Sequence, residues 1–103
     1  MHITDRSEEV IAEMRSKIET ALDGVGFLAE GNAKALAPVD TGHLRDSITH
    51  KAHGNAVTIG TVVEYASFVE LGTSKHAAQP FLGPAIADHL QEYRELIYNT
   101  LKS

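Results

Sequence analysis

The sequence of 103 residues contains no cysteine, so disulfides, thiolate metal sites and cysteine nucleophiles are excluded. It also lacks long apolar runs. No stretch approaches the roughly 20 apolar residues that a membrane-spanning helix needs. The segment "MHITDRSEEV" turns acidic at once and lacks the basic and then apolar pattern of a secretory signal. We therefore expect a protein that is made in the cytoplasm and has no membrane partner.

Positive charge is also scarce, because nine lysines and arginines stand against fourteen acidic residues, for a net charge of -5. A protein whose affinity comes from neutralising phosphates needs a basic surface. Nucleic acid is thus not the first partner to expect, although a nucleic-acid-binding accessory protein stays open as an alternative. The content of 43% hydrophobic and 22% charged residues is that of an ordinary globular chain. Its length suits a single domain over residues 1–103.

The first third of the chain has the three-and-four spacing of one helix face. Apolar or small residues recur at Ile11, Met14, Ile18, Ala21, Val25, Leu28, Asn32 and Ala35. The pattern predicts a helix from about Ser7 to Ala37. We expect most of this stripe to be core and part of it to be available to a neighbouring subunit, and a coiled-coil seam is the alternative.

Both ends of this helix have signals, and its middle has a weak point. Asp5 and Glu8 have the spacing of an N-terminal capping pair, and Pro38 disfavours helical backbone before it. Gly24 and Gly26 each cost about 1 kcal/mol in a helix interior. We therefore predict a bend or break at these glycines.

The next segment, from His43 to Glu64, has a strand-like pattern around Gly54-Asn55, which is suited to a two-residue hairpin turn. Such a turn pairs His53 with Ala56. The register gives one mostly apolar face, which includes Ile48, Ile59 and Val63. Continued outward, the same register places Arg45 across from Glu64 as an opposite-charge pair.

The remainder predicts a short helix, an exposed loop and a final helix. Tyr65, Phe68 and Val69 have the spacing of a short helix that buries them, exposes Glu70 and Thr73, and ends at Gly72. Pro84 suits the first position of a last helix, whose apolar residues are Ile86, Leu90, Tyr93, Ile97 and Leu101. The fold class is therefore α+β, with a long N-terminal helix and a C-terminal helix packed on a small antiparallel sheet around a hairpin.

No set of residues predicts catalysis, a cofactor or a metal. His50 and His53 point to opposite faces of a strand, and no HExxH pattern accompanies them. Asp40, His43 and Ser47 are residue types of a hydrolytic triad, but without a nucleophile elbow. We therefore expect no enzyme, while a small metal-dependent hydrolase that uses histidines remains the third possibility.

Three ordered segments carry a resemblance to a known family. They are "PVDTGHLRDSI", "VEYASFVELGT" and "QPFLGPAI", within Pro38 to Ile86. Together they resemble the head-tail joining or tail completion proteins of tailed bacteriophages and prophages. The resemblance implies small α+β subunits that form a ring, usually of six, between the head connector and the tail tube of the virion. It implies no catalysis and no cofactor, and DNA only passes through the lumen.

The resemblance also suggests roles for individual residues. The residue types of "PVDTG" independently predict a structural turn, formed by Pro38, Asp40, Thr41 and Gly42. There Asp40 accepts hydrogen bonds from nearby backbone N–H groups and Gly42 supplies a positive φ. A contact with another subunit or a partner is expected at Arg45, Glu70, Leu71, Gly72, Thr73, Gln79 and Phe81. Leu71 replaces a common aromatic and Gly83 a frequent basic residue, so contacts at these points differ from the family pattern.

Overall fold

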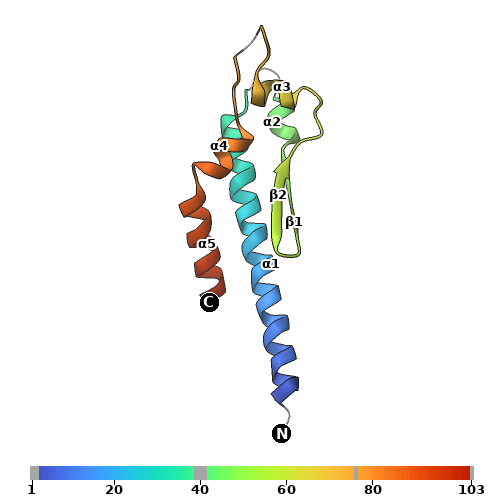
Figure 1. The fold of residues 1–103 in the computed structure, drawn as a ribbon, viewed down its shortest axis with the longest axis vertical. Helices are drawn as coiled ribbons and strands as arrows, with labels where there is room; N and C mark the ends of the chain where they lie inside the picture. The colour runs from blue at the N-terminus through green and yellow to red at the C-terminus, as the bar shows by residue number, and fades with distance from the viewer. Residues whose placement is uncertain (1–2, 39–41, 76, 103) are drawn as a thin grey trace.

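A computed structural model describes residues 3–38, 42–75 and 77–102, with side chains from residue 7 onward. The molecule is elongated and measures 70 × 24 × 21 Å (Figure 1). Its elements are α1 (Ile3–Leu36), α2 (His43–Ser47), β1 (Thr49–His53), β2 (Ala56–Gly60), α3 (Ala66–Leu71), α4 (Leu82–Ala87) and α5 (Leu90–Lys102). This arrangement confirms the predicted α+β class, with a single hairpin as the sheet in the described residues. Within those same ranges no helix is both long and apolar enough to cross a membrane.

Helix α1 runs without interruption through Gly24 and Gly26, so the predicted break is wrong, while the alternative of a bend stays a prediction. The glycines allow close packing instead. A Cβ atom on Gly26 would lie 2.3 Å from Cδ2 of His50, and one on Gly24 would lie 3.1 Å from Cδ2 of Leu96. The helix also begins at Ile3, which places Asp5 inside it rather than at its cap.

The hairpin has the predicted register, with His53 opposite Ala56 and His50 opposite Ile59. Its turn uses the left-handed conformation of Gly54, whose φ is 62°. The strands are shorter than the pattern suggested, because residues 43–47 form α2. Arg45 is therefore not paired across a strand with Glu64, and that prediction is wrong. Its Nε atom lies 3.4 Å from Oδ1 of the adjacent Asp46.

Helix α1 lies between the hairpin on one side and α5 on the other (Figure 1). One core cluster lies at the upper end of α1 and contains Ala33, Ala37, Leu44, Ile48, Ala66, Phe81 and Ala85. A second cluster, lower on α1, contains Val25, Ala29 and Tyr93. Ile59 packs against both clusters, as the predicted apolar hairpin face requires. The many alanines let the neighbouring elements approach the helix axis closely.

The last helix is divided in two, whereas the sequence pattern predicted one helix that starts at Pro84. Pro84 is the third residue of α4, and a turn follows before α5. Tyr93 connects the pieces, because its hydroxyl donates to the carbonyl of Ala85 and accepts a 2.9 Å hydrogen bond from Nδ2 of Asn32. Asn32 is thereby a polar link between α1 and α5 inside the subunit.

Candidate interaction surfaces

The first part of α1 extends beyond the rest of the subunit. The hairpin turn, Gly54 and Asn55, lies beside Arg15 to Glu19, where these elements line a shared hollow. Helix α1 continues past this turn and past the end of α5 (Figure 1). Three apolar residues lie on this extension, with exposed fractions of 50% for Val10, 51% for Ile11 and 54% for Met14. They continue the apolar stripe that is buried farther along the helix.

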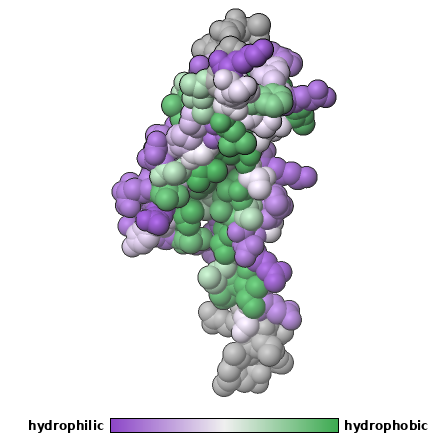
Figure 2. Space-filling view, turned by 45° about the horizontal axis from the view of Figure 1, so that its top comes forward, coloured by the Kyte–Doolittle hydropathy of each residue, from purple (hydrophilic) through white to green (hydrophobic). Residues whose placement is uncertain are grey.

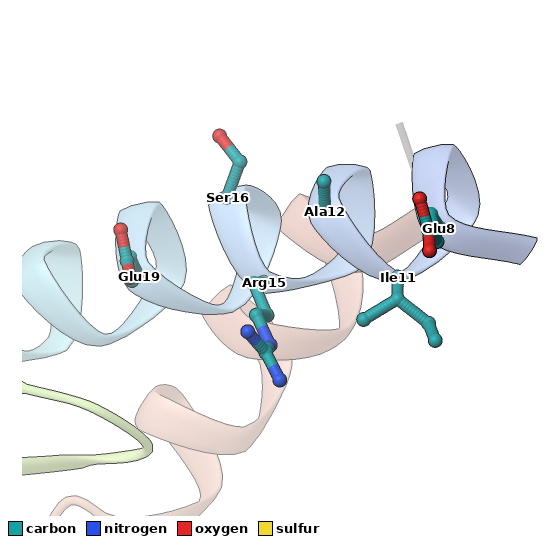
Figure 3. Close-up of a pocket in the computed structure, with 6 residues that line it drawn as sticks. All are labelled: Glu8, Ile11, Ala12, Arg15, Ser16 and Glu19. Atoms are coloured by element: carbon teal, nitrogen blue, oxygen red, sulfur yellow. The ribbon is translucent and has the colours of Figure 1, made fainter. Parts of the chain in front are cut away.

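The space-filling view shows the same surface at the scale of the whole molecule. In Figure 2 a hydrophobic band runs down one face between hydrophilic borders and continues onto the lower part of α1. The hollow at this lower part is lined by six residues of α1 alone, so it is an open depression and not an enclosed pocket. Ile11 and Ala12 both line this depression and point in different directions from the helix (Figure 3). The surface is therefore suited to contact with a macromolecule rather than to enclosure of a small ligand.

A second apolar surface lies at the other end of the subunit, around α3. A hollow there is lined by Pro38, Tyr65, Phe68, Val69, Thr73, Ala77 and Gln79. Phe68 is 61% exposed and Tyr65 42%, so the predicted burial of these two rings is wrong. The short helix α3 instead turns Ala66 into the core. Thr73 and Gln79, both predicted as contact residues, are brought together at this hollow.

Glu70 is half-buried, and its carboxylate is directed toward the start of α4. Its Oε1 accepts hydrogen bonds from the backbone N–H groups of Phe81 and Leu82, at 3.0 and 2.9 Å, and its Oε2 accepts one from Gly83 at 3.1 Å. Burial alone would raise the pKa of this carboxyl group. The three backbone hydrogen bonds outweigh burial, so the pKa lies below its ordinary value of 4.5. The predicted exposure of Glu70 is therefore wrong.

The other predicted contact residues divide between surface and interior. Leu71 is 78% exposed, whereas Phe81 is fully buried in the upper core cluster. Gly72 has a φ of 81°, and a Cβ atom on it would lie 2.7 Å from the backbone nitrogen of Ala78. Gly72 is thus needed for the course of the chain. Participation of any of these residues in an interface stays a prediction.

The predicted turn residues lie where α1 leads into α2. Gly42 is buried and has a φ of 75°, a conformation that glycine adopts without strain. Its carbonyl accepts a 2.9 Å hydrogen bond from the backbone N–H of Asp46, which closes the first turn of α2. Pro38 is half-buried and lines the hollow beside α3. Asp40 and Thr41 lie outside the described residues.

His50 forms a charged cluster that the sequence pattern did not reveal. Its Nδ1 lies 2.9 Å from Oε1 of Glu30, and its Nε2 lies 3.0 Å from Oδ1 of Asp23. The hydrogen bond with Glu30 is the main cause that raises the pKa of His50 above 6.5, and it also lowers the pKa of Glu30. A sequence signal does exist, since two acids seven residues apart on α1 flank a glycine. This pattern predicts a histidine site only if β1 is already known to cross α1 beside that glycine.

The histidine and triad alternatives receive no structural support from the described residues. The two carboxylates of the His50 cluster meet different ring nitrogens and do not converge on one point. Among residues 7–38, 42–75 and 77–102 no group of three or more possible ligands could hold a metal ion. The hydroxyl of Ser47 donates to the carbonyl of Leu44 and also contacts the hydroxyl of Thr61.

Comparison with known proteins gives one match. The sequence model of the HK97-gp10-like family, described as "Bacteriophage HK97-gp10, putative tail-component", matches residues 3–72. This range is more than half of the chain and runs from the start of α1 to the end of α3. It includes the first of the three segments that carry the resemblance to phage tail completion proteins, and all of the second except its last residue, Thr73. No curated protein and no solved structure matches the chain. The chain thus belongs to the HK97-gp10-like family of bacteriophage tail components.

Proposed function

We propose that this protein is a non-catalytic structural component of a tailed phage or prophage particle, where copies of it form a ring that joins head and tail. Six copies in the assembled ring is the number that the resemblance suggests. The neighbours in the particle are head-connector and tail-tube proteins, and DNA passes through the lumen.

The observation that carries the proposal is the apolar band along α1, which continues where none of the other described helices and strands covers it. Exposed apolar surface of this kind usually marks a protein contact. A long, narrow subunit with an apolar band along its length is suited to lateral packing against other copies. In a ring that encloses DNA, such packing leaves the ends of the subunit for contacts with the head and the tail.

The exposed residues around α3 provide a separate surface at one end of the subunit. Phe68 and Leu71 are largely exposed beside the hollow that includes Thr73 and Gln79. Aromatic side chains are enriched in protein interfaces. We assign this end surface to a neighbouring component of the particle. Glu70 and Phe81 are not assigned to it, because their side chains serve the interior of the subunit.

The test is a double variant, Ile11→Glu with Met14→Glu, introduced into the phage. Both positions lie outside the core, so the subunit should stay folded, while two charges on the apolar band should prevent lateral packing. Heads and tails should then both form but fail to join. Electron microscopy of lysates, together with counts of infectious particles, free heads and free tails, measures this result.

The matched control is Ala12→Glu with Ser16→Glu, which adds the same two charges to the same turns of α1. Ala12 and Ser16 also line the open depression, but they point away from the side on which Ile11 lies (Figure 3), so the control separates the apolar band from the depression. The control should give normal titres. Equal titres for the two double variants, with both proteins present in particles, would remove this part of α1 from the proposed contact.

A further inference from the structure

His50 occupies a site that α1 shapes for an imidazole ring. Its side chain is only 10% exposed although it lies on a two-stranded hairpin at the edge of the subunit. Gly26 leaves the space that the imidazole ring occupies, because any Cβ atom at this position would overlap the ring. The ring of Phe27 lies against it, with 4.4 Å between the ring centres. The site therefore depends on a glycine that costs helix stability.

The two hydrogen-bond partners determine the protonation state of this ring. Asp23 and Glu30 lie two helical turns apart on α1, and each carboxylate oxygen faces one ring nitrogen. Carboxylates only accept hydrogen bonds, and both imidazole nitrogens are donors only in the protonated ring. A neutral ring would bring a nitrogen lone pair within about 3 Å of a carboxylate oxygen, so one of the two contacts would become repulsive.

We propose that His50 is a pH-sensitive clamp, which as an imidazolium holds the hairpin against α1 and on losing its proton at alkaline pH loosens the hairpin. The charged groups that face it come from α1: Asp23, Glu30 and, through its 3.1 Å ion pair with Glu30, Lys34. From β2 the neighbours are Ile59, its partner in the register, and Val57, both uncharged. His53 and Lys51 lie on the exposed face of β1.

The sign of the pH dependence follows from the direction of the shift. The pKa of His50 is raised in the folded protein. The stability that the clamp contributes is therefore fully present below the ordinary pKa of 6.5 and is lost as pH rises through the folded pKa. Between these two values one extra proton is bound in the folded state. The folding equilibrium constant should therefore fall by up to about tenfold per pH unit in that window.

The experiment follows the ring nitrogen signals of His50 by NMR in the full chain between about pH 5 and pH 9, beside urea unfolding at each pH. At about pH 6.5 both nitrogens should carry protons in more than half of the folded molecules, because the pKa of His50 lies above that value. Amide exchange in Thr49–His53 and Ala56–Gly60 should accelerate at alkaline pH more than exchange in α5. A His50 ring that is mostly neutral at about pH 6.5 would overturn the proposal.

Two variants separate the clamp from general histidine effects. His50→Gln should abolish the fall in stability above pH 6.5, whereas His53→Gln, on the exposed face of the same strand, should keep it. If His50→Gln does not fold, Asp23→Asn takes its place and should move the titration of His50 to lower pH. An unchanged wild-type slope in His50→Gln, or an unmoved titration in Asp23→Asn, would contradict the clamp.

Discussion

At the scale of single residues, Glu70 is a charged residue of the type usually found on the surface, yet its side chain stabilises the fold. It lies on α3 but accepts hydrogen bonds from Phe81, Leu82 and Gly83 at the start of α4. The next residue, Pro84, has no N–H group to satisfy. One carboxylate thus accepts hydrogen bonds from the backbone N–H groups that have no partner within α4. It also holds the two ends of the loop between α3 and α4 together.

We expect Glu70→Gln to lower the free energy of unfolding by about 1–3 kcal/mol at neutral pH, because the amide offers one acceptor oxygen and presents a donor to the remaining N–H groups. The folded pKa of Glu70 lies below the ordinary 4.5, so its contribution is present above that value and is lost as pH falls through the folded pKa. Urea unfolding of both proteins should therefore show a difference at about pH 7 that shrinks below about pH 4. A difference independent of pH would contradict this role.

The sequence could not reveal the roles of Glu70 and His50, because both depend on groups that folding brings together. The hydrogen-bond donors around Glu70 are backbone N–H groups, which leave no residue-type signal. His50 meets α1 at residues 20 and 27 positions earlier in the chain. The conformation of Gly42 depends mainly on its neighbours in the chain, so the "PVDTG" segment was enough to predict its positive φ.

At the scale of elements, the continuity of α1 depends on what packs against its glycines. Gly26 accommodates His50 and Gly24 accommodates Leu96, so the hairpin and α5 both lie close to the helix axis. Hydrophobic spacing predicted the helix well, because that spacing is a property of the helix itself. Whether two glycines break a helix is decided by its neighbours, and the sequence pattern did not contain them.

Gly26→Ala and Gly31→Ala form a matched pair in the same helix. Alanine favours helix over glycine by up to about 1 kcal/mol, so Gly31→Ala, where an added Cβ meets nothing within 4 Å, should raise the melting temperature. Gly26→Ala should lower it, because the Cβ would overlap His50. Thermal unfolding followed by circular dichroism measures both. A stabilised Gly26→Ala protein would show that the ring of His50 is not held against the helix.

The hairpin provides a second test at this scale. Ile59→Asp should place a charge between the two core clusters and lower the free energy of unfolding by about 3 kcal/mol or more, enough to unfold a domain of this size. Thr58→Asp, on the exposed face of the same strand, should change it by about 0.5 kcal/mol or less. Two similar denaturation curves would contradict the packing of this face.

The register of this hairpin was predictable because turn residues and a two-residue alternation both specify it. The residues at which the strands begin and end were not predictable from this pattern. The alternating pattern continues through Leu44 and Asp46, but a helical turn after Gly42 satisfies the backbone there and still buries Leu44. Similarly, the buried residue of α3 is the small Ala66, with Val69 only partly buried against the same cluster. Large side chains dominate a sequence pattern, and in this subunit several of them face outward.

At the scale of the whole molecule, the net charge of -5 bears on the passage of DNA through the proposed ring. An acidic surface repels phosphate, so the ring should let DNA pass without holding it. We expect no retention of duplex DNA by the purified protein at about 50 mM salt, measured by electrophoretic mobility shift. Binding that weakens steeply with added salt would instead favour a nucleic-acid-binding protein.

The length of α1 also affects how the free protein moves through solvent. The radius of gyration is 17.7 Å, whereas a compact domain of this length has one of about 13 Å. An extended particle has more friction than a sphere of equal mass. A monomer will therefore leave a size-exclusion column early and sediment slowly, and calibration against globular standards would mistake it for a dimer. Its mass in solution has to be measured by a method that does not depend on shape, such as light scattering.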